Sequence, residues 1–299
     1  MGVRLSLRRR EQLLGLALIA PTVIFIAAVV IYPVAATLGL SFFSENLLRP
    51  ERGTQFIGID NFARIFRDDL FWMGLKNTVV LTAAAVVGEV VLGMIVALTL
   101  NAPFRGRGVI RTLNILPWVV PSFVAAFIWI WLFHPQFGPI NQFLVWSGIV
   151  DQGIPWISQG STAMGSVIVV YIWKGLPWTF LVLLAGLQSI PEEWYEAAKV
   201  DGASPWQQFR YITLPSLRYI LVIVIVLRTI WTFNNFDLVY LLTGGGPARA
   251  TVTLPLNVYS TAFLQYDFGL SAAIAAFMVV VVLGLSIVVL KLSRIETET

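Results

Sequence analysis

The sequence contains no cysteine and a single histidine, His134, among its 299 residues. Disulfide bonds, iron–sulfur clusters and thiol catalysis are therefore excluded, and so is a zinc site of the usual histidine-rich kind. Charge is scarce as well: Asp, Glu, Lys and Arg make up 12% of the chain, where a soluble protein carries about 25%. Such a chain cannot cover its outside with charge, which excludes a soluble enzyme, a disordered chain and a fibrous protein.

The sequence is instead rich in apolar residues. Hydrophobic residues make up 58% of the chain, and the mean hydropathy is +0.81. The net charge of +4 would point to nucleic acid in a soluble protein. Membrane proteins, however, keep surplus Lys and Arg on their cytoplasmic loops, and no basic stripe alternates with aromatic residues here. We therefore predict that lipid surrounds most of the chain and that no nucleic acid is bound.

Apolar stretches long enough to cross a bilayer recur along the sequence. A spanning helix needs about 20 mostly apolar residues. The predicted spans are residues 12–38, 78–100, 109–133, 163–188, 219–242 and 270–290. The apolar run after Arg8, Arg9 and Arg10 is too long for a signal peptide, so a retained first helix is expected. The prediction is an all-α membrane protein with six transmembrane helices, occupying residues 12–299 after an N-terminal segment of residues 1–11.

The distribution of basic residues predicts the orientation. If the N-terminus is cytoplasmic, the loops on that side carry twice as many Lys and Arg residues as the other loops. Both termini are then cytoplasmic. Residues 41–77 form an outer loop, and residues 191–215 form a cytoplasmic loop.

The loop at 191–215 is longer than a simple connection needs. Glu192 and Glu193 suit the first turn of a helix, and Gly202 can stop that helix in the left-handed conformation. Ser204 and Gln207 have the spacing of a capping box, so a second short helix follows, which Pro215 closes. From local physics alone, this bent pair is either an amphipathic hairpin at the membrane surface or a docking element.

Three ionisable residues interrupt the spans: Glu89, Lys174 and Arg228. Ionisable groups inside membranes face the bundle interior or a water-filled cavity, where they line a path or pair with one another. We interpret Glu89 as structural, because nothing near it in the sequence resembles a site. Arg228 is interpreted as part of a path.

Two predicted spans carry polar and aromatic residues on one face. Arg228, Trp231, Thr232 and Asn235 are spaced i, i+3, i+4 and i+7 on the fifth span. On the fourth span, Lys174, Gly175 and Trp178 form a comparable stripe. An amide, a hydroxyl and indole rings together suit a sugar, because they offer hydrogen bonds to hydroxyls and flat surfaces to C–H groups.

The cytoplasmic loop also carries a family pattern. It matches the conserved loop of ABC-importer permeases at every position and spacing of that pattern, namely Glu196, Ala197, Ala198, Gly202, Ile212, Leu214 and Pro215. Throughout its length the chain resembles the carbohydrate branch of that family, which includes the maltose and glycerol-phosphate permeases. The strongest local likeness lies in residues 231–237 and 241–247.

The resemblance implies a type I importer fold, in a bacterial or archaeal cell membrane. In that family, the loop seats in a cleft of an ATPase dimer, so Glu196 would pair with a basic group there and Gly202 would make the bend. The other expected partners are a second, unlike permease subunit, an extracytoplasmic solute-binding protein, lipid and the sugar. Substrate-lining positions carry over to Gly175, Trp178, Trp231, Thr232 and Asn235.

The sequence agrees that ATP binds a separate ATPase subunit, because this chain contains no phosphate-binding loop of the G-x-x-x-x-G-K-[ST] form. ATP and Mg²⁺ are therefore expected on the partner ATPase, with no cofactor or metal in this chain. Lys174 and Arg228 stand where the maltose permease is uncharged, so glycerol phosphate or another anionic sugar is the alternative cargo. A secondary transporter would show inverted repeats, and a membrane enzyme would show clustered acids or histidines; neither feature is present.

Overall fold

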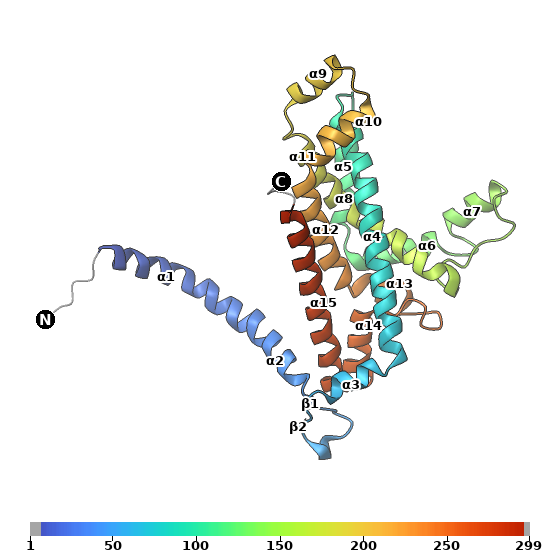
Figure 1. The fold of residues 1–299 in the computed structure, drawn as a ribbon. Coiled ribbons are helices and arrows are strands. Elements are labelled where there is room, and N and C mark those ends of the chain that lie inside the picture. Colours follow the sequence, from blue (N-terminus) through green and yellow to red (C-terminus); the bar gives the residue numbers. More distant parts are fainter. Residues whose placement is uncertain (1–6, 296–299) are drawn as a thin grey trace. The chain divides into compact units, whose positions relative to one another are not determined.

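A computed structural model describes residues 7–295, which are mostly helical (Figure 1). Residues 1–6 of the predicted N-terminal segment, and residues 296–299, lie outside the described part. The helices are α1 (Leu7–Ile26), α2 (Tyr32–Leu40), α3 (Asp60–Phe66), α4 (Asp69–Asn101), α5 (Arg107–Val119), α6 (Ser122–Leu132), α7 (Pro139–Trp146), α8 (Gly160–Leu187), α9 (Glu192–Val200), α10 (Pro205–Gln208), α11 (Leu214–Ser216), α12 (Arg218–Phe233), α13 (Asp237–Thr243), α14 (Leu254–Tyr259) and α15 (Phe268–Ile295). Wider π-helical turns join α1 to α2, α10 to α11, and follow α14. A short antiparallel hairpin pairs β1 (Phe43–Ser44) with β2 (Gln55–Phe56).

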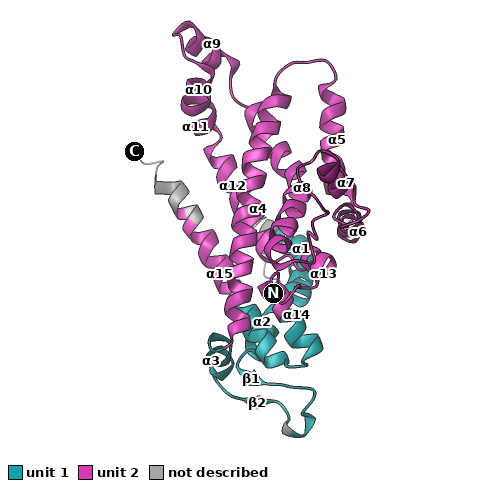
Figure 2. Cartoon of the chain, turned by 90° about the vertical axis from the view of Figure 1, so that its right-hand side faces the viewer, with its two compact units in different colours: residues 1–67, 258–277 teal, residues 68–257, 278–299 magenta. Residues whose placement is uncertain are grey.

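The chain divides into two compact units, coloured in Figure 2. One unit holds residues up to 67 together with 258–277, and the other holds residues 68–257 with 278 onward. In the first unit, the apolar helix from Leu14 to Leu40 has no buried residue in its most hydrophobic window. Its side chains are therefore free to meet lipid or another protein.

The structure contains four to six candidate spans. Four helices are long and apolar enough on their own, covering residues 14–40, 69–101, 160–187 and 268–288. Two bent pairs add one span each if each pair crosses the membrane as a unit. A largely helical membrane protein is confirmed, and the exact count of six remains a prediction.

The third predicted span, expected as one helix over residues 109–133, is broken. α5 and α6 meet at an angle of 101°. Pro121 is the N-cap of α6 and has no N–H for a continuous ladder, while Val120 before it is extended. The break therefore follows from proline chemistry.

The fifth predicted span, residues 219–242, is also interrupted. α12 ends at Phe233 and α13 begins at Asp237. Between them, the side-chain oxygen of Asn235 accepts a hydrogen bond of 3.3 Å from the N–H of Leu238. This bond satisfies one of the free donors at the start of α13, which stabilises the break.

The core of the larger unit lies where α4, α8 and α12 pack together. Phe180 and Leu183 of α8 are fully buried, and Val224 of α12 and Ala97 of α4 pack in the same cluster. Small residues bring the backbones close: a Cβ on Gly93 of α4 would meet Thr179 of α8 at 2.8 Å. Close approach of this kind is how membrane helices gain packing energy without a hydrophobic driving force.

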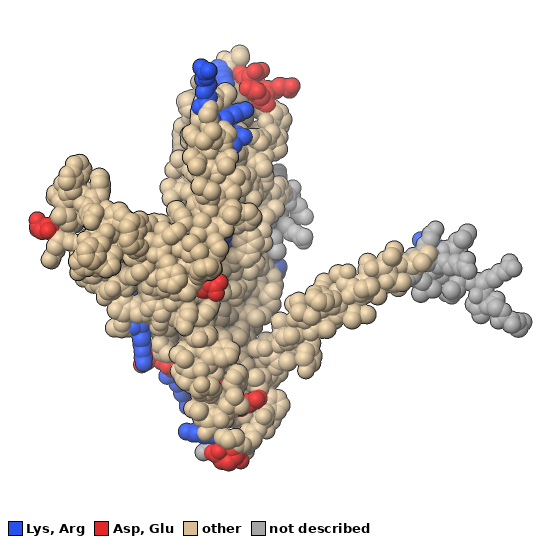
Figure 3. Space-filling view, turned by 180° about the vertical axis from the view of Figure 1, so that it is seen from behind, with Lys and Arg blue, Asp and Glu red and all other residues tan. Residues whose placement is uncertain are grey.

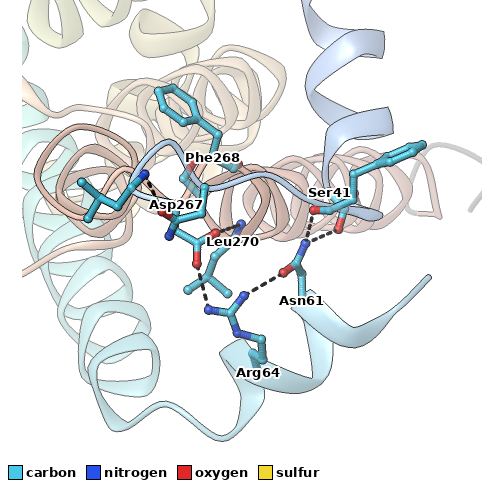
Figure 4. Close-up of polar contacts among 10 residues, drawn as sticks. Ser41, Asn61, Arg64, Asp267, Phe268 and Leu270 are labelled. Atoms are coloured by element: carbon cyan, nitrogen blue, oxygen red, sulfur yellow. Dashed lines mark hydrogen bonds and ion pairs between the residues drawn. The ribbon is translucent and has the colours of Figure 1, made fainter. Parts of the chain in front are cut away.

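In the smaller unit, one asparagine joins separate segments (Figure 4). Asn61 is completely buried, and its amide donates to the carbonyls of Ser41 at 3.0 Å and Phe43 at 2.8 Å. Its oxygen accepts from Arg64, which also forms an ion pair of 2.8 Å with Asp267. The start of the 41–77 loop is therefore held to α3 by hydrogen bonds of a buried side chain, and α3 is held to the residue before α15 by an ion pair.

Asn61→Ala is expected to lower the free energy of unfolding by about 1–3 kcal/mol, because two buried carbonyls lose their donor. Arg64→Ala is the matched control, since its side chain is 49% exposed and an ion pair of that kind contributes about 0–1 kcal/mol. Thermal unfolding of the purified protein in detergent measures both. Equal losses from the two substitutions would contradict the assignment of the stabilisation to Asn61.

Candidate functional site

A polar cavity of about 190 Å³ lies among α8, α12 and α13 and the end of α5. Its lining consists of Trp118, Tyr171, Lys174, Gly175, Arg228, Trp231, Thr232, Asn235 and Leu238. Every residue predicted for the path is in this lining except Trp178. The Trp178 ring packs edge-to-face against Trp231, with centroids 4.9 Å apart. The two stripes read from the sequence therefore meet at one place in the fold.

Arg228 does not face this cavity as a free cation. Its Nε and Nη2 both donate to the carboxylate of Glu89 on α4, which is completely buried. Its guanidinium carbon lies 5.8 Å from the centre of the Trp231 ring. The geometry agrees with the structural interpretation of Glu89, and it gives Arg228 a structural role beside its place in the cavity wall.

Gly175 lies directly against this ion pair. A Cβ at this position would overlap the ends of both the Arg228 and the Glu89 side chains. Because Gly175 has no side chain, α8 leaves space for the ion pair between Glu89 of α4 and Arg228 of α12. Gly175 lines the cavity as predicted, and the contact explains why no side chain is accommodated there.

Lys174 has a partner that the sequence could not indicate. Its ammonium donates to the carbonyl of Val120 at 2.6 Å. Val120 is the residue at which α5 ends. The break before α6 leaves that carbonyl without an intrahelical donor, and a cation suits the negative end of a helix dipole.

Two polar groups of the cavity-lining residues have hydrogen-bonding capacity that the described residues do not use. The hydroxyl oxygen of Thr232 is buried and has no hydrogen-bond partner among the described residues. The Asn235 oxygen accepts from the Tyr171 hydroxyl at 2.7 Å and from the Leu238 N–H, which turns the amide nitrogen toward other acceptors. Together with the indoles of Trp118 and Trp231, these groups can bind a sugar by hydrogen bonding and stacking.

Sequence reasoning missed Tyr171 and Trp118. Tyr171 lies three and four residues before Lys174 and Gly175, on the same stripe of α8, so that periodicity could have found it. Trp118 follows Pro117 near the end of α5, and no pattern marked it. Its place in the cavity depends on the sharp turn between α5 and α6.

The loop at 191–215 forms the predicted bent pair of helices. Gly202 has a φ of +79°, and the N–H groups of Gly202 and Ala203 bond the carbonyls of Lys199 and Ala198. This is the Schellman pattern that ends a helix. The capping box of Ser204 and Gln207 is confirmed in both directions.

Two prolines of this loop lie elsewhere than their residue type suggests. Pro191, which would suit the first helical position, stands one residue before α9 as its N-cap. Pro215 lies inside α11, so it does not close the second helix. The polypeptide continues from α11 into α12, and the helical segments 205–216 and 218–233 meet at an angle of 67°.

Four of the seven predicted coupling residues line an open groove on this loop. The groove, about 590 Å³, is lined by Trp194, Ala197, Ala198, Asp201, Tyr211, Ile212, Pro215 and Ser216. Glu196, Gly202 and Leu214 lie outside its lining but are exposed. The Tyr195 hydroxyl bonds the Thr213 hydroxyl at 2.8 Å and holds the two arms of the loop together.

Charge gathers at the end of the unit that carries this loop (Figure 3). The helical side below it is largely uncharged in the same view. α15 runs toward the same end of this unit (Figure 1). A charged end above an apolar flank is the surface expected where a membrane protein leaves the bilayer.

Comparison with known proteins identifies the family. Residues 89–295 match the model of the "Binding-protein-dependent transport system inner membrane component" family. The chain is 35% identical to the trehalose/maltose transport system permease protein MalF of Thermococcus litoralis, covering 98% of each chain. It is also 35% identical to the sulfoquinovosyl glycerol transport system permease protein SmoG of Agrobacterium fabrum, covering 95% of this chain and 91% of that one.

A solved structure gives the same result for the fold. A bacterial alginate ABC transporter, crystallised with a periplasmic protein bound to an alginate pentasaccharide, contains a chain with a TM-score of 0.83 and 25% identity over 97% of each chain. The resemblance drawn from the 191–215 loop is confirmed by these independent matches. The chain belongs to the family of inner membrane components of binding-protein-dependent transport systems, as an ABC transporter permease.

Proposed function

We propose that this chain is the permease subunit of a sugar importer and that its polar cavity is half of the sugar path. The observation that carries the proposal is the pair of available groups beside the indoles: the Thr232 hydroxyl and the Asn235 amide. Relatives named for trehalose/maltose and sulfoquinovosyl glycerol transport support a sugar. A transporter must hold its cargo briefly and release it, and a few hydrogen bonds with stacking suit that need.

The 191–215 loop is the proposed coupling element to an ATPase dimer. Its groove, its exposed Glu196 and its glycine bend support this role. ATP and Mg²⁺ would bind the ATPase, and no cofactor would bind this chain. ATP can drive the path between its two states only through contacts at the loop that differ between those states.

The complete importer is proposed to contain a second, unlike permease and an extracytoplasmic solute-binding protein. The second permease would complete the cavity, since the walls contributed by this chain leave it open. Both termini and the 191–215 loop would face the cytoplasm, with residues 41–77 outside. The excess of basic residues on the loops of the proposed cytoplasmic side supports this orientation.

Thr232→Val tests the path. The substitution keeps the shape of the side chain and removes the hydroxyl, so sugar uptake should fall about 10- to 100-fold because a buried hydrogen bond to cargo is lost. Uptake of labelled trehalose, maltose and other sugars into proteoliposomes with the complete transporter measures the effect. Binding-protein-stimulated ATP hydrolysis reports that the assembly is intact.

Thr99→Val is the matched control. Thr99 is an exposed residue of α4 whose hydroxyl bonds the carbonyl of Ile95 in its own helix at 2.8 Å. Its substitution should leave uptake near the wild-type rate. If Thr232→Val also transports every accepted sugar at the wild-type rate, the cavity is not the path.

A further inference from the structure

The Glu89–Arg228 pair lies in the wall of the cavity, and its two members face the cavity unequally. Arg228 is part of the lining, whereas Glu89 lies behind it and is completely buried. Two guanidinium N–H groups, on Nε and Nη2, are committed to the carboxylate. A cargo in the cavity therefore meets the remaining donor edge of Arg228 with the negative charge directly behind it.

This placement changes the chemistry of the wall. An unpaired guanidinium in a low-dielectric site attracts anions strongly and binds carboxylate, phosphate or sulfate groups in a bidentate manner. With Glu89 on its Nε and Nη2, the pair is neutral overall, and those two N–H groups are no longer available for such binding. Three N–H groups remain as neutralised donors, on a guanidinium whose carbon lies 5.8 Å from the centre of the Trp231 ring.

The second cation of the wall is also compensated. The Lys174 ammonium donates to the Val120 carbonyl at the end of α5. The negative end of that helix dipole offsets part of its charge. Neither cation that suggested an anionic cargo thus stands free in the cavity.

We infer that Glu89 is a specificity-determining residue: by pairing with Arg228 it adapts the cavity to uncharged sugars and prevents anions from occupying it. The inference rests on the proposed function, because it assigns the cargo class of the same cavity. Glu89 acts through Arg228 and does not touch the cargo.

The test measures sugar uptake in the presence of inorganic sulfate. Proteoliposomes with the complete transporter take up trehalose or maltose, and external sulfate replaces chloride at constant ionic strength. The wild type should be insensitive to sulfate. In Glu89→Gln, the released guanidinium should bind sulfate, so sulfate should half-inhibit uptake at a concentration at least about tenfold below the highest one that leaves the wild type unaffected.

Two further variants identify the source of the effect. Glu89→Gln/Arg228→Gln removes both charges, so sulfate sensitivity should return to the wild-type level. Lys174→Met in the Glu89→Gln background should leave the sensitivity high, because it arises at Arg228. Loss of sensitivity in that background would assign the anion site to Lys174 and overturn the inference.

Glu89→Asp provides a second route if Glu89→Gln does not assemble with its ATPase. Aspartate keeps the carboxylate but places it one methylene farther from Arg228. The sulfate sensitivity of this variant should therefore lie between those of the wild type and Glu89→Gln. Wild-type sensitivity in an assembled Glu89 variant overturns the inference. Uptake by the wild type of glucuronate but of no uncharged sugar overturns the inference alone, whereas uptake of no sugar at all overturns the proposed function.

Discussion

Gly202→Asp is expected to abolish sugar uptake while the chain still reaches the membrane. In the isolated chain, nothing lies within 4 Å of a Cβ at this position, and Asp tolerates the left-handed conformation better than most residues. The substitution should therefore cost this chain little. A charged side chain at the bend would instead meet whatever surface receives the loop, where an unpaired charge that loses its water is strongly unfavourable.

The measurement combines uptake in proteoliposomes with recovery of the ATPase when this chain is purified from its native membrane in mild detergent. We expect uptake to fall by a factor of about 100 or more, with a matching loss of the co-purified ATPase. Wild-type uptake with Asp at this position would contradict the coupling role. The loop would then be a hairpin at the membrane surface.

Gly106→Asp is the matched control. Gly106 also has a positive φ, of +90°, and also has open space around it, but it lies in the turn between α4 and α5. Backbone strain should affect the two variants alike. Only a role for the loop in binding a partner predicts that Gly202→Asp is far more harmful than Gly106→Asp.

Local features of the chain were predictable from the sequence because their causes lie within a few residues. The capping box at Ser204 and the left-handed Gly202 depend on neighbouring side chains and backbone alone. The stripes of α8 and α12 follow from helical periodicity, and the fold brings them to one cavity. The apolar stretches follow from the thickness of a bilayer.

The remaining features depend on contacts that no local pattern encodes. Glu89 and Arg228 are 139 residues apart, and they pair only because α4, α8 and α12 pack around Gly175. Lys174 reaches Val120 only because α5 ends there. A sequence shows that these residues are charged and lie within spans; their partners are set by helix packing.

Gly175→Ala is expected to prevent assembly of a stable transporter. The added methyl group would overlap the ends of both Glu89 and Arg228, so the two side chains must separate or move together. Breaking a buried ion pair costs about 3–5 kcal/mol, because each charge is left without compensation. The amount of folded chain recovered in detergent, its thermal unfolding midpoint and its co-purified ATPase measure the loss.

Gly165→Ala is the control on the same helix. Nothing lies within 4 Å of a Cβ there, so alanine should be neutral or stabilise α8 by about 0.5–1 kcal/mol. The cause is tested further in the Glu89→Gln/Arg228→Gln background, where no charge remains to be separated. There Gly175→Ala should be much less harmful, since substitutions in direct contact do not add. An equal penalty in both backgrounds would mean that the glycine serves helix packing alone and has no special relation to the ion pair.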